Sequence, residues 1–103
     1  MARAPIHPGE HLADELEALG MSANALSKQI GVPANRITAI LHGTRGITGD
    51  TALRLGHFFG TSADMWLNLQ KLYELRRAEQ ETGGMIASLS VFDRTAWEAR
   101  QQR

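Results

Sequence analysis

Apolar residues recur at helical spacing along most of the chain, and residues that start or stop helices bound each run. In the first run, Leu12, Leu16 and Leu19 follow one another at i, i+4 and i+7, which places them on one helical face. Pro8 suits the first position of a helix because its missing N–H would be unpaired there. Gly20 supplies a stop. The pattern therefore predicts an amphipathic first helix.

Two short helices are predicted next. Ser22 is a suitable N-cap for the second helix, and Gly31 ends it. The third helix runs from about Ala34 to Leu41, and Gly43 closes it. The residues of these two helices expected to face the core are Ala25, Leu26, Ile30, Ile37, Ile40 and Leu41.

A fourth and a longer fifth helix complete the regular pattern. Thr48 is the expected N-cap of the fourth helix, which stops at Gly60. Thr61 or Ser62 then caps the fifth helix, which is expected to continue to about Glu81. The inward residues are expected to be Ala52, Leu53, Leu55, Phe58 and Phe59 in the fourth helix and Met65, Trp66, Leu69, Leu72 and Tyr73 in the fifth.

The run TGG at 82–84 breaks the helical pattern, and the chain beyond it is too apolar for an inert tail. The stretch 86–92 fits either a short strand or part of a helix, and Asp93 fits the cap of a last helix. We therefore expect an all-α domain over 1–81, followed by a C-terminal extension over 82–103 that contacts a second subunit or a partner protein.

Charge is segregated along the chain, although eleven Lys and Arg balance eleven Asp and Glu. Residues 10–17 hold four acids and no Lys or Arg, whereas residues 22–46 hold Lys28, Arg36 and Arg45 and no acid. The zero net charge alone argues against a nucleic-acid partner, but the basic segment provides cations for phosphates.

Several classes of protein are disfavoured. The chain has no cysteine, which excludes disulfides, thiolate zinc sites and a cysteine nucleophile. His7 and His11 flank Glu10, which suggests a metal site. Pro8 and Gly9, however, place His7 before the helix, and no third candidate ligand lies at a spacing typical of metal sites. Neither a metal nor a cofactor is expected.

The sequence also carries no nucleophile–base arrangement and no phosphate-cradling loop, so an enzyme is not expected. It has no secretory signal and no apolar stretch near the roughly 18 residues that span a bilayer. We therefore expect a cytoplasmic protein without a membrane partner.

The segment from Ala23 to Gly43 fits a helix-turn-helix. Two helices that cross at close range need a small residue at the contact, which Ser27 supplies. The turn favours glycine because glycine accepts a positive φ, and Gly31 lies there. The apolar positions that lock the pair to the core are Leu26, Ile30, Val32, Ile37 and Ile40. All seven positions agree with the pattern, which predicts DNA binding.

With these residues in place, the stretch from Ile6 to Leu69 is similar to antitoxins (addiction module antidotes) of the HigA/VapI type, within the lambda-repressor-like (Xre) helix-turn-helix family. The resembling segments are IHPGEHL at 6–12, GVPANRITAILHGTRGIT at 31–48, DTALRLGHFFGTS at 50–62 and MWLNLQ at 65–70. They span about two-thirds of the chain. Gly49 departs from the Pro or Ala expected there, which loosens the start of that helix.

The resemblance implies a five-helix lambda-repressor-like domain that forms a homodimer and binds a palindromic operator. It also implies that the protein represses its own operon and neutralises a toxin, a HigB/RelE-like ribonuclease that cleaves mRNA. Two alternatives remain: a stand-alone regulator of the same fold without a toxin, and a protein-interaction module whose helix-turn-helix has lost DNA binding.

The third helix would be the recognition helix, with its first residues directed at base edges in the major groove. Asn35 matches an adenine edge, Arg36 matches guanine or a phosphate, and Thr38 offers a hydroxyl to phosphate or a methyl to thymine. Lys28 and Arg45 would hold the DNA backbone. The outward positions of this helix are expected to be Ala34, Asn35, Arg36, Thr38, Ala39 and His42.

Each assignment has a simpler alternative. Asn35 also suits a cap at the start of the helix. The alternative for Arg36 is a solvated surface arginine, and that for His42 is a solvated residue favoured by the negative end of the helix dipole.

Overall fold

The computed structural model describes residues 4–102, which hold six helices and no strand. The helices are α1 (Pro8–Leu19), α2 (Ala23–Ile30), α3 (Ala34–Leu41), α4 (Gly49–Phe59), α5 (Ala63–Ala87) and α6 (Arg94–Gln101). The predicted all-α fold is therefore confirmed, with one helix more than the five of the regular pattern.

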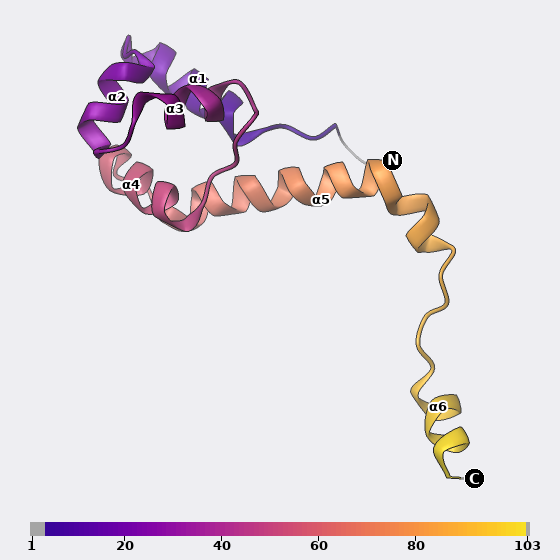
Figure 1. Cartoon of the computed structure of the whole chain (residues 1–103). Coiled ribbons are helices and arrows are strands. Elements are labelled where there is room, and N and C mark those ends of the chain that lie inside the picture. Colours follow the sequence, from indigo (N-terminus) through magenta and orange to yellow (C-terminus); the bar gives the residue numbers. More distant parts are fainter. Residues whose placement is uncertain (1–3, 103) are drawn as a thin grey trace.

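The helices form a small body with a long projection (Figure 1). α1 to α4 and the first part of α5 make the body, and the rest of α5 extends away from it. A non-helical segment, 88–93, then leads to α6 at the far end. The described part of the chain consequently measures 67 Å along its longest axis, against 27 and 21 Å across. Within residues 4–102, no helix is long and apolar enough to cross a membrane.

Side-chain caps start three helices where the sequence predicted them. The Ser22 hydroxyl accepts the backbone N–H of the third residue of α2 at 3.0 Å. Ser62 does the same for α5 at 3.1 Å, which decides between the two predicted caps of that helix. The Asp93 carboxylate caps α6 at 3.1 Å and confirms a last helix. The stretch 86–92 forms no strand, because α5 continues to Ala87 and the chain then turns.

One core joins the first five helices. Trp66 is its largest buried side chain, at 1% exposure, and the Phe59 ring lies 6.0 Å from it. The predicted inward positions are confirmed for most residues of α1 to α4. The buried apolar residues are Leu12, Leu16, Leu26, Ile30, Ile37, Ile40, Ile47, Ala52, Leu55 and Trp66.

Four residues that the sequence pattern placed inward are exposed. Leu53 is 66% exposed, because its neighbour Ala52 points into the core and successive helical residues turn by about 100°. Leu19 lies in the last turn of α1 and is 56% exposed. Met65 and Leu72 of α5 are exposed beside the buried face that Trp66 defines.

Two glycines allow elements to approach more closely than any other residue would. Gly9 is buried, and a Cβ added there would overlap the Ile40 carbonyl oxygen of α3. Gly56 of α4 lies against the start of α5, where an added Cβ would be 2.9 Å from the Ser62 carbonyl carbon. These contacts fix the position of α3 against α1 and of α5 against α4.

α5 runs through the predicted break at 82–84 and ends at Ala87. The Thr82 hydroxyl donates to the Ala78 carbonyl at 2.9 Å, which keeps that side chain within the helical pattern. The Ser88 hydroxyl donates to the Met85 carbonyl at 2.6 Å where the helix ends. The prediction that the helix stops near Glu81 is therefore wrong by about two turns.

Gly49 is the first residue of α4, and its backbone is not in the left-handed region. A Cβ added there meets nothing within 4 Å. We therefore expect Gly49→Ala to raise the free energy of unfolding by about 0.5–1 kcal/mol, because alanine has less backbone freedom to lose on folding. Thermal unfolding followed by circular dichroism tests this, and a lower melting temperature would contradict it.

Candidate nucleic-acid interface

α2 and α3 pack as the predicted helix-turn-helix. Gly31 ends α2 at a φ of 72°, a left-handed conformation that glycine adopts without strain. The next amide, of Val32, donates to the Ser27 carbonyl at 3.0 Å and closes the turn. Ser27 is 3% exposed, as the small residue at a close helix crossing should be.

The starts of α3 and α4 are open. The N-caps are Pro33 and Thr48, and neither side chain makes a capping hydrogen bond. The first N–H groups of a helix have no partner within the helix, and its N-terminus carries a partial positive charge. The N–H groups of these two helix starts are therefore available to donate hydrogen bonds to phosphate oxygens.

The side chains on α3 that were predicted to read bases differ in their exposure and in their hydrogen bonds. Asn35 is exposed, and its amide has no hydrogen-bond partner within residues 4–102. The alternative that it caps α3 is wrong, because that helix has no side-chain cap. Thr38 is half-buried and its hydroxyl donates to the Asn35 carbonyl at 3.2 Å. Ala34 and Ala39 are half-buried, and His42 is exposed just after the helix.

Arg36 forms an ion pair with α4. Its Nη1 donates to Asp50 Oδ2 of α4 at 3.0 Å, and its side chain is only 25% exposed. Arg54 Nε donates to the same oxygen at 3.0 Å. The hydrogen bond from Arg54 holds the pKa of the Asp50 carboxyl below its usual value, and Arg36 adds to this effect.

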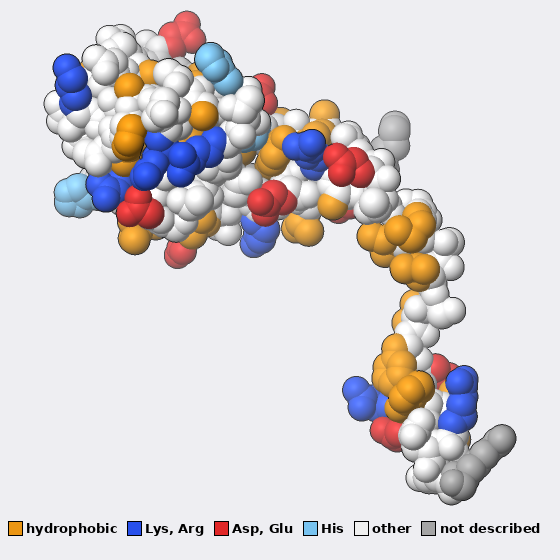
Figure 2. All heavy atoms as spheres, viewed as in Figure 1, with side chains coloured by type: hydrophobic (Ala, Val, Ile, Leu, Met, Phe, Trp, Pro, Cys, Tyr) orange, Lys and Arg blue, Asp and Glu red, His pale blue; other side chains and the backbone are white. Residues whose placement is uncertain are grey.

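Lys28 and Arg45, the predicted contacts to the DNA backbone, are both exposed. Lys28 lies in the last turn of α2, and Arg45 lies in the loop between α3 and α4. Figure 2 shows Lys and Arg side chains gathered on the face of the body in view, with an acidic side chain at the edge of the group. Asp50 and Arg54 were not among the residues predicted from the sequence, although their i,i+4 spacing on a predicted helix was a usable signal.

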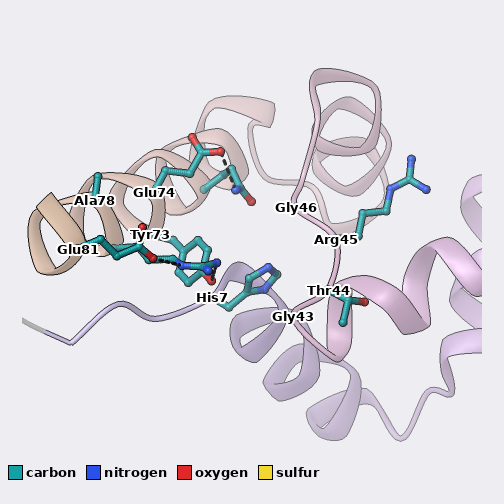
Figure 3. A pocket seen from close by; sticks show the side chains of 11 residues that line it. His7, Gly43, Thr44, Arg45, Gly46, Tyr73, Glu74, Ala78 and Glu81 are labelled. Atoms are coloured by element: carbon teal, nitrogen blue, oxygen red, sulfur yellow. Dashed lines mark hydrogen bonds and ion pairs between the residues drawn. The ribbon is translucent and has the colours of Figure 1, made fainter.

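A hollow of about 330 Å³ separates the α3–α4 loop from α5 (Figure 3). His7 lies on one side of it, with its ring edge-on to the Tyr73 ring at 4.8 Å. Its Nδ1 accepts the Gly9 N–H at 2.9 Å, and its backbone N–H donates to Glu10 at 3.2 Å. His7 therefore caps α1. Within the described residues, no three His, Asp or Glu side chains are grouped as metal ligands.

The cap depends on pH, because a protonated Nδ1 cannot accept the Gly9 N–H. Partial burial lowers the pKa of His7 from 6.5, against the opposing effects of Glu10 and of a hydrogen bond to the Arg45 backbone. A lowered pKa means that the unfolded chain binds a proton more readily than the folded one. The free energy of unfolding should therefore fall as the pH drops below about 6.5.

Urea unfolding at pH 5 and pH 7.5 measures this fall. His7→Asn is the control variant, because asparagine accepts the same hydrogen bond and does not titrate. We expect the free energy of unfolding to change less between pH 5 and pH 7.5 in the variant than in the wild-type protein. Equal differences in the two proteins would show that the His7 cap does not carry the effect.

Comparison with known proteins identifies the family of this chain and several of its relatives. Residues 12–66 match the model of the helix-turn-helix family. Virulence-associated protein I of Dichelobacter nodosus is 52% identical over 77 residues, covering 74% of this chain and 71% of that protein. An addiction module antidote protein of the HigA family from Coxiella burnetii superposes with a TM-score of 0.84 at 51% identity, covering 87% of this chain and all of that one.

A third relative was solved with DNA. The Pseudomonas aeruginosa antitoxin HigA, in a structure with the higBA promoter, has a TM-score of 0.82 and 41% identity. The match covers 86% of this chain and 99% of that one. The comparisons confirm the resemblance to HigA-type antidotes that the sequence motifs indicated.

Proposed function

Because this chain belongs to the helix-turn-helix family, we propose that it is a dimeric repressor that binds a palindromic operator and neutralises a toxin. The family consists of DNA-binding regulators and antitoxins and is not enzymatic. Its members with solved structures include a HigA antitoxin with its promoter, which supports both DNA binding and the antitoxin role. The protein would act in the cytoplasm, where its operator lies.

The uncapped first turn of α3, with Asn35 exposed on it, carries the DNA-binding proposal. Asn35 would pair with an adenine edge and Arg36 with guanine. Ala34 and Ala39 are small enough for close contact with thymine methyl groups, and Thr38 offers a methyl or a hydroxyl. Contacts to the phosphates would come from Lys28, His42, Arg45 and the open starts of α3 and α4.

A dimer follows from the energy that recognition needs. One bidentate base contact supplies about 1–3 kcal/mol of discrimination, whereas specific sites are typically favoured by about 4–10 kcal/mol. Two recognition helices, spaced about 34 Å apart on a palindrome, would supply the difference. The exposed apolar residues of the C-terminal extension are the proposed subunit contact.

Binding to the DNA upstream of the protein's own reading frame tests the repressor role. We expect fluorescence anisotropy to show tight binding to this DNA and weak binding to a scrambled duplex. If each subunit places three cations on phosphates, the logarithm of the affinity should fall against the logarithm of salt with a slope of about −5. Arg36→Ala and Asn35→Ala should each weaken binding by about 10-fold or more. Equal binding to both duplexes would instead favour an interaction module without specific DNA binding.

Co-expression with the adjacent reading frame tests the toxin-neutralising role. The neighbouring product carries the only affinity tag, so this chain is recovered only if the two form a complex. We expect the neighbour alone to arrest growth and to cleave mRNA, and co-expression to restore growth. If the neighbour neither arrests growth nor binds this chain, the protein is a stand-alone regulator of the same fold.

A further inference from the structure

A carboxylate lies within the group of arginines that would face DNA. Asp50 is exposed, with 57% of its side chain accessible, yet its Oδ2 accepts hydrogen bonds from Arg36 and Arg54 at 3.0 Å each. A negative charge at this place repels phosphates, so it lowers the affinity for DNA of any sequence. A carboxylate beside the proposed recognition helix therefore needs a benefit that offsets this loss of affinity.

We propose that Asp50 is a positioning residue for DNA recognition, which holds Arg36 in the orientation that reads a guanine and suppresses binding to other DNA. This inference rests on the proposed function, because it assigns the specificity of that same interface. Two features of the contacts argue for it.

The first feature is the set of N–H groups that Arg36 retains. A guanidinium has five N–H donors. One on Nη1 binds Asp50, and Nε is buried without a hydrogen-bond partner among residues 4–102. Of the three N–H groups that remain, one is on Nη1 and two are on Nη2, which leaves a donor on each terminal nitrogen. Such a pair matches the O6 and N7 acceptors of guanine, which arginine reads through two hydrogen bonds.

The second feature is a brace that holds Asp50 itself. Arg54 lies one turn after Asp50 in α4, and its Nη1 donates to the Ile30 carbonyl at the end of α2 at 2.7 Å. The same guanidinium thus binds the carboxylate through Nε and the helix-turn-helix through Nη1. Asp50 is thereby tied to α2, while its own oxygen fixes Arg36 on α3. An arginine that is already ordered loses less rotamer freedom when it binds a base.

The test compares Asp50→Asn with the full-length wild-type protein. The DNA probes are the operator, operators with a single base pair changed under α3, and a scrambled duplex. We expect Asp50→Asn to raise the affinity for the scrambled duplex about 3-fold, since a charge that repels phosphate is gone. At one G·C position, we expect discrimination against the changed base to fall about 5- to 10-fold, part of what a bidentate contact supplies.

Two controls separate positioning from charge and from stability. Asp14→Asn removes the same charge from the exposed face of α1, where Asp14 forms no ion pair within the described residues, and it should leave discrimination unchanged. In an Arg36→Ala background, Asp50→Asn should no longer alter discrimination at that position, because the residue through which it acts is absent. The melting temperatures of all variants are measured alongside.

The outcomes are distinct. If the wild-type protein does not distinguish operator from scrambled DNA, the proposed function falls and this inference falls with it. If the wild-type protein does distinguish them but Asp50→Asn changes every duplex by the same factor, only the inference is overturned. In that case Arg36 contacts a phosphate, and Asp50 acts through its charge alone.

Discussion

Among the glycines of the chain, Gly9 is the one whose replacement with alanine should lower the free energy of unfolding most. The new Cβ would overlap the Ile40 carbonyl oxygen and lie 2.9 Å from its carbon, both in the backbone of α3. A flexible side chain could move aside, but here α1 and α3 themselves must separate. Overpacking of a well-packed interior costs about 1–3 kcal/mol, and we expect the upper end of this range or more.

For a domain of this size, such a loss lowers the melting temperature by roughly 10–20 °C. Differential scanning calorimetry measures it directly. Gly84→Ala is the matched control, because Gly84 lies in α5 and an added Cβ there meets nothing within 4 Å. We expect the control to be neutral or stabilised. If the melting temperature of Gly9→Ala equals that of the wild-type protein, the close packing of α1 on α3 does not hold α3 in place.

Placing a charge on the C-terminal extension should greatly weaken operator binding, although the extension lies outside the helix-turn-helix. Val91 is 93% exposed and Phe92 61% exposed. Together with other exposed apolar residues, they mark a surface suited to association. The exposed large apolar residues from 85 onward are Met85, Ile86, Leu89, Val91, Phe92 and Trp97.

If this surface joins two subunits, Val91→Asp combined with Phe92→Asp yields a folded monomer that can fill only one half-site. The affinity for the full palindrome should then fall on the order of 100-fold or more, while binding to an isolated half-site changes little. Light scattering coupled to size-exclusion chromatography gives the mass, and anisotropy gives the affinity. Leu19→Asp makes a similar change at an exposed leucine of α1 and should leave both unaffected. A double variant that remains a dimer would place the subunit contact elsewhere.

Most helix starts were predictable because local chemistry sets them. Ser22 and Asp93 cap helices through side chains that bond to N–H groups three residues away, so the information lies within one turn of sequence. Gly31 likewise ends α2 through its own backbone preference. These features need no knowledge of the rest of the fold.

The end of α5 was not predictable from the same local rules. Each glycine in a helix interior costs about 1 kcal/mol relative to alanine, which made 82–84 look like a break. An established helix extends at little cost per residue, and α5 continues for about two turns beyond Glu81. Propensity alone does not decide between these two effects.

The helix-turn-helix was predictable from the sequence, but the ion pair that joins α3 to α4 was not. The motif identified α3 and its polar residues, because the spacing of small and apolar residues is local. The ion pair between Arg36 and Asp50 joins residues fourteen apart on separate helices. It depends on how α4 packs beside α3, which is a tertiary property. The Asp50–Arg54 pair is local, and its i,i+4 spacing was visible in the sequence.

The proposed recognition helix, α3, has eight residues, fewer than the roughly 12–15 that an isolated helix needs in water. α3 therefore has little stability of its own and depends on Ile37 and Ile40, which are fully buried against the other helices. A genetic screen for lost repression should accordingly recover substitutions of buried residues as often as substitutions at the DNA-facing surface. Raising the growth temperature should sort the two groups, since defects of the first kind worsen with heat and those of the second kind do not.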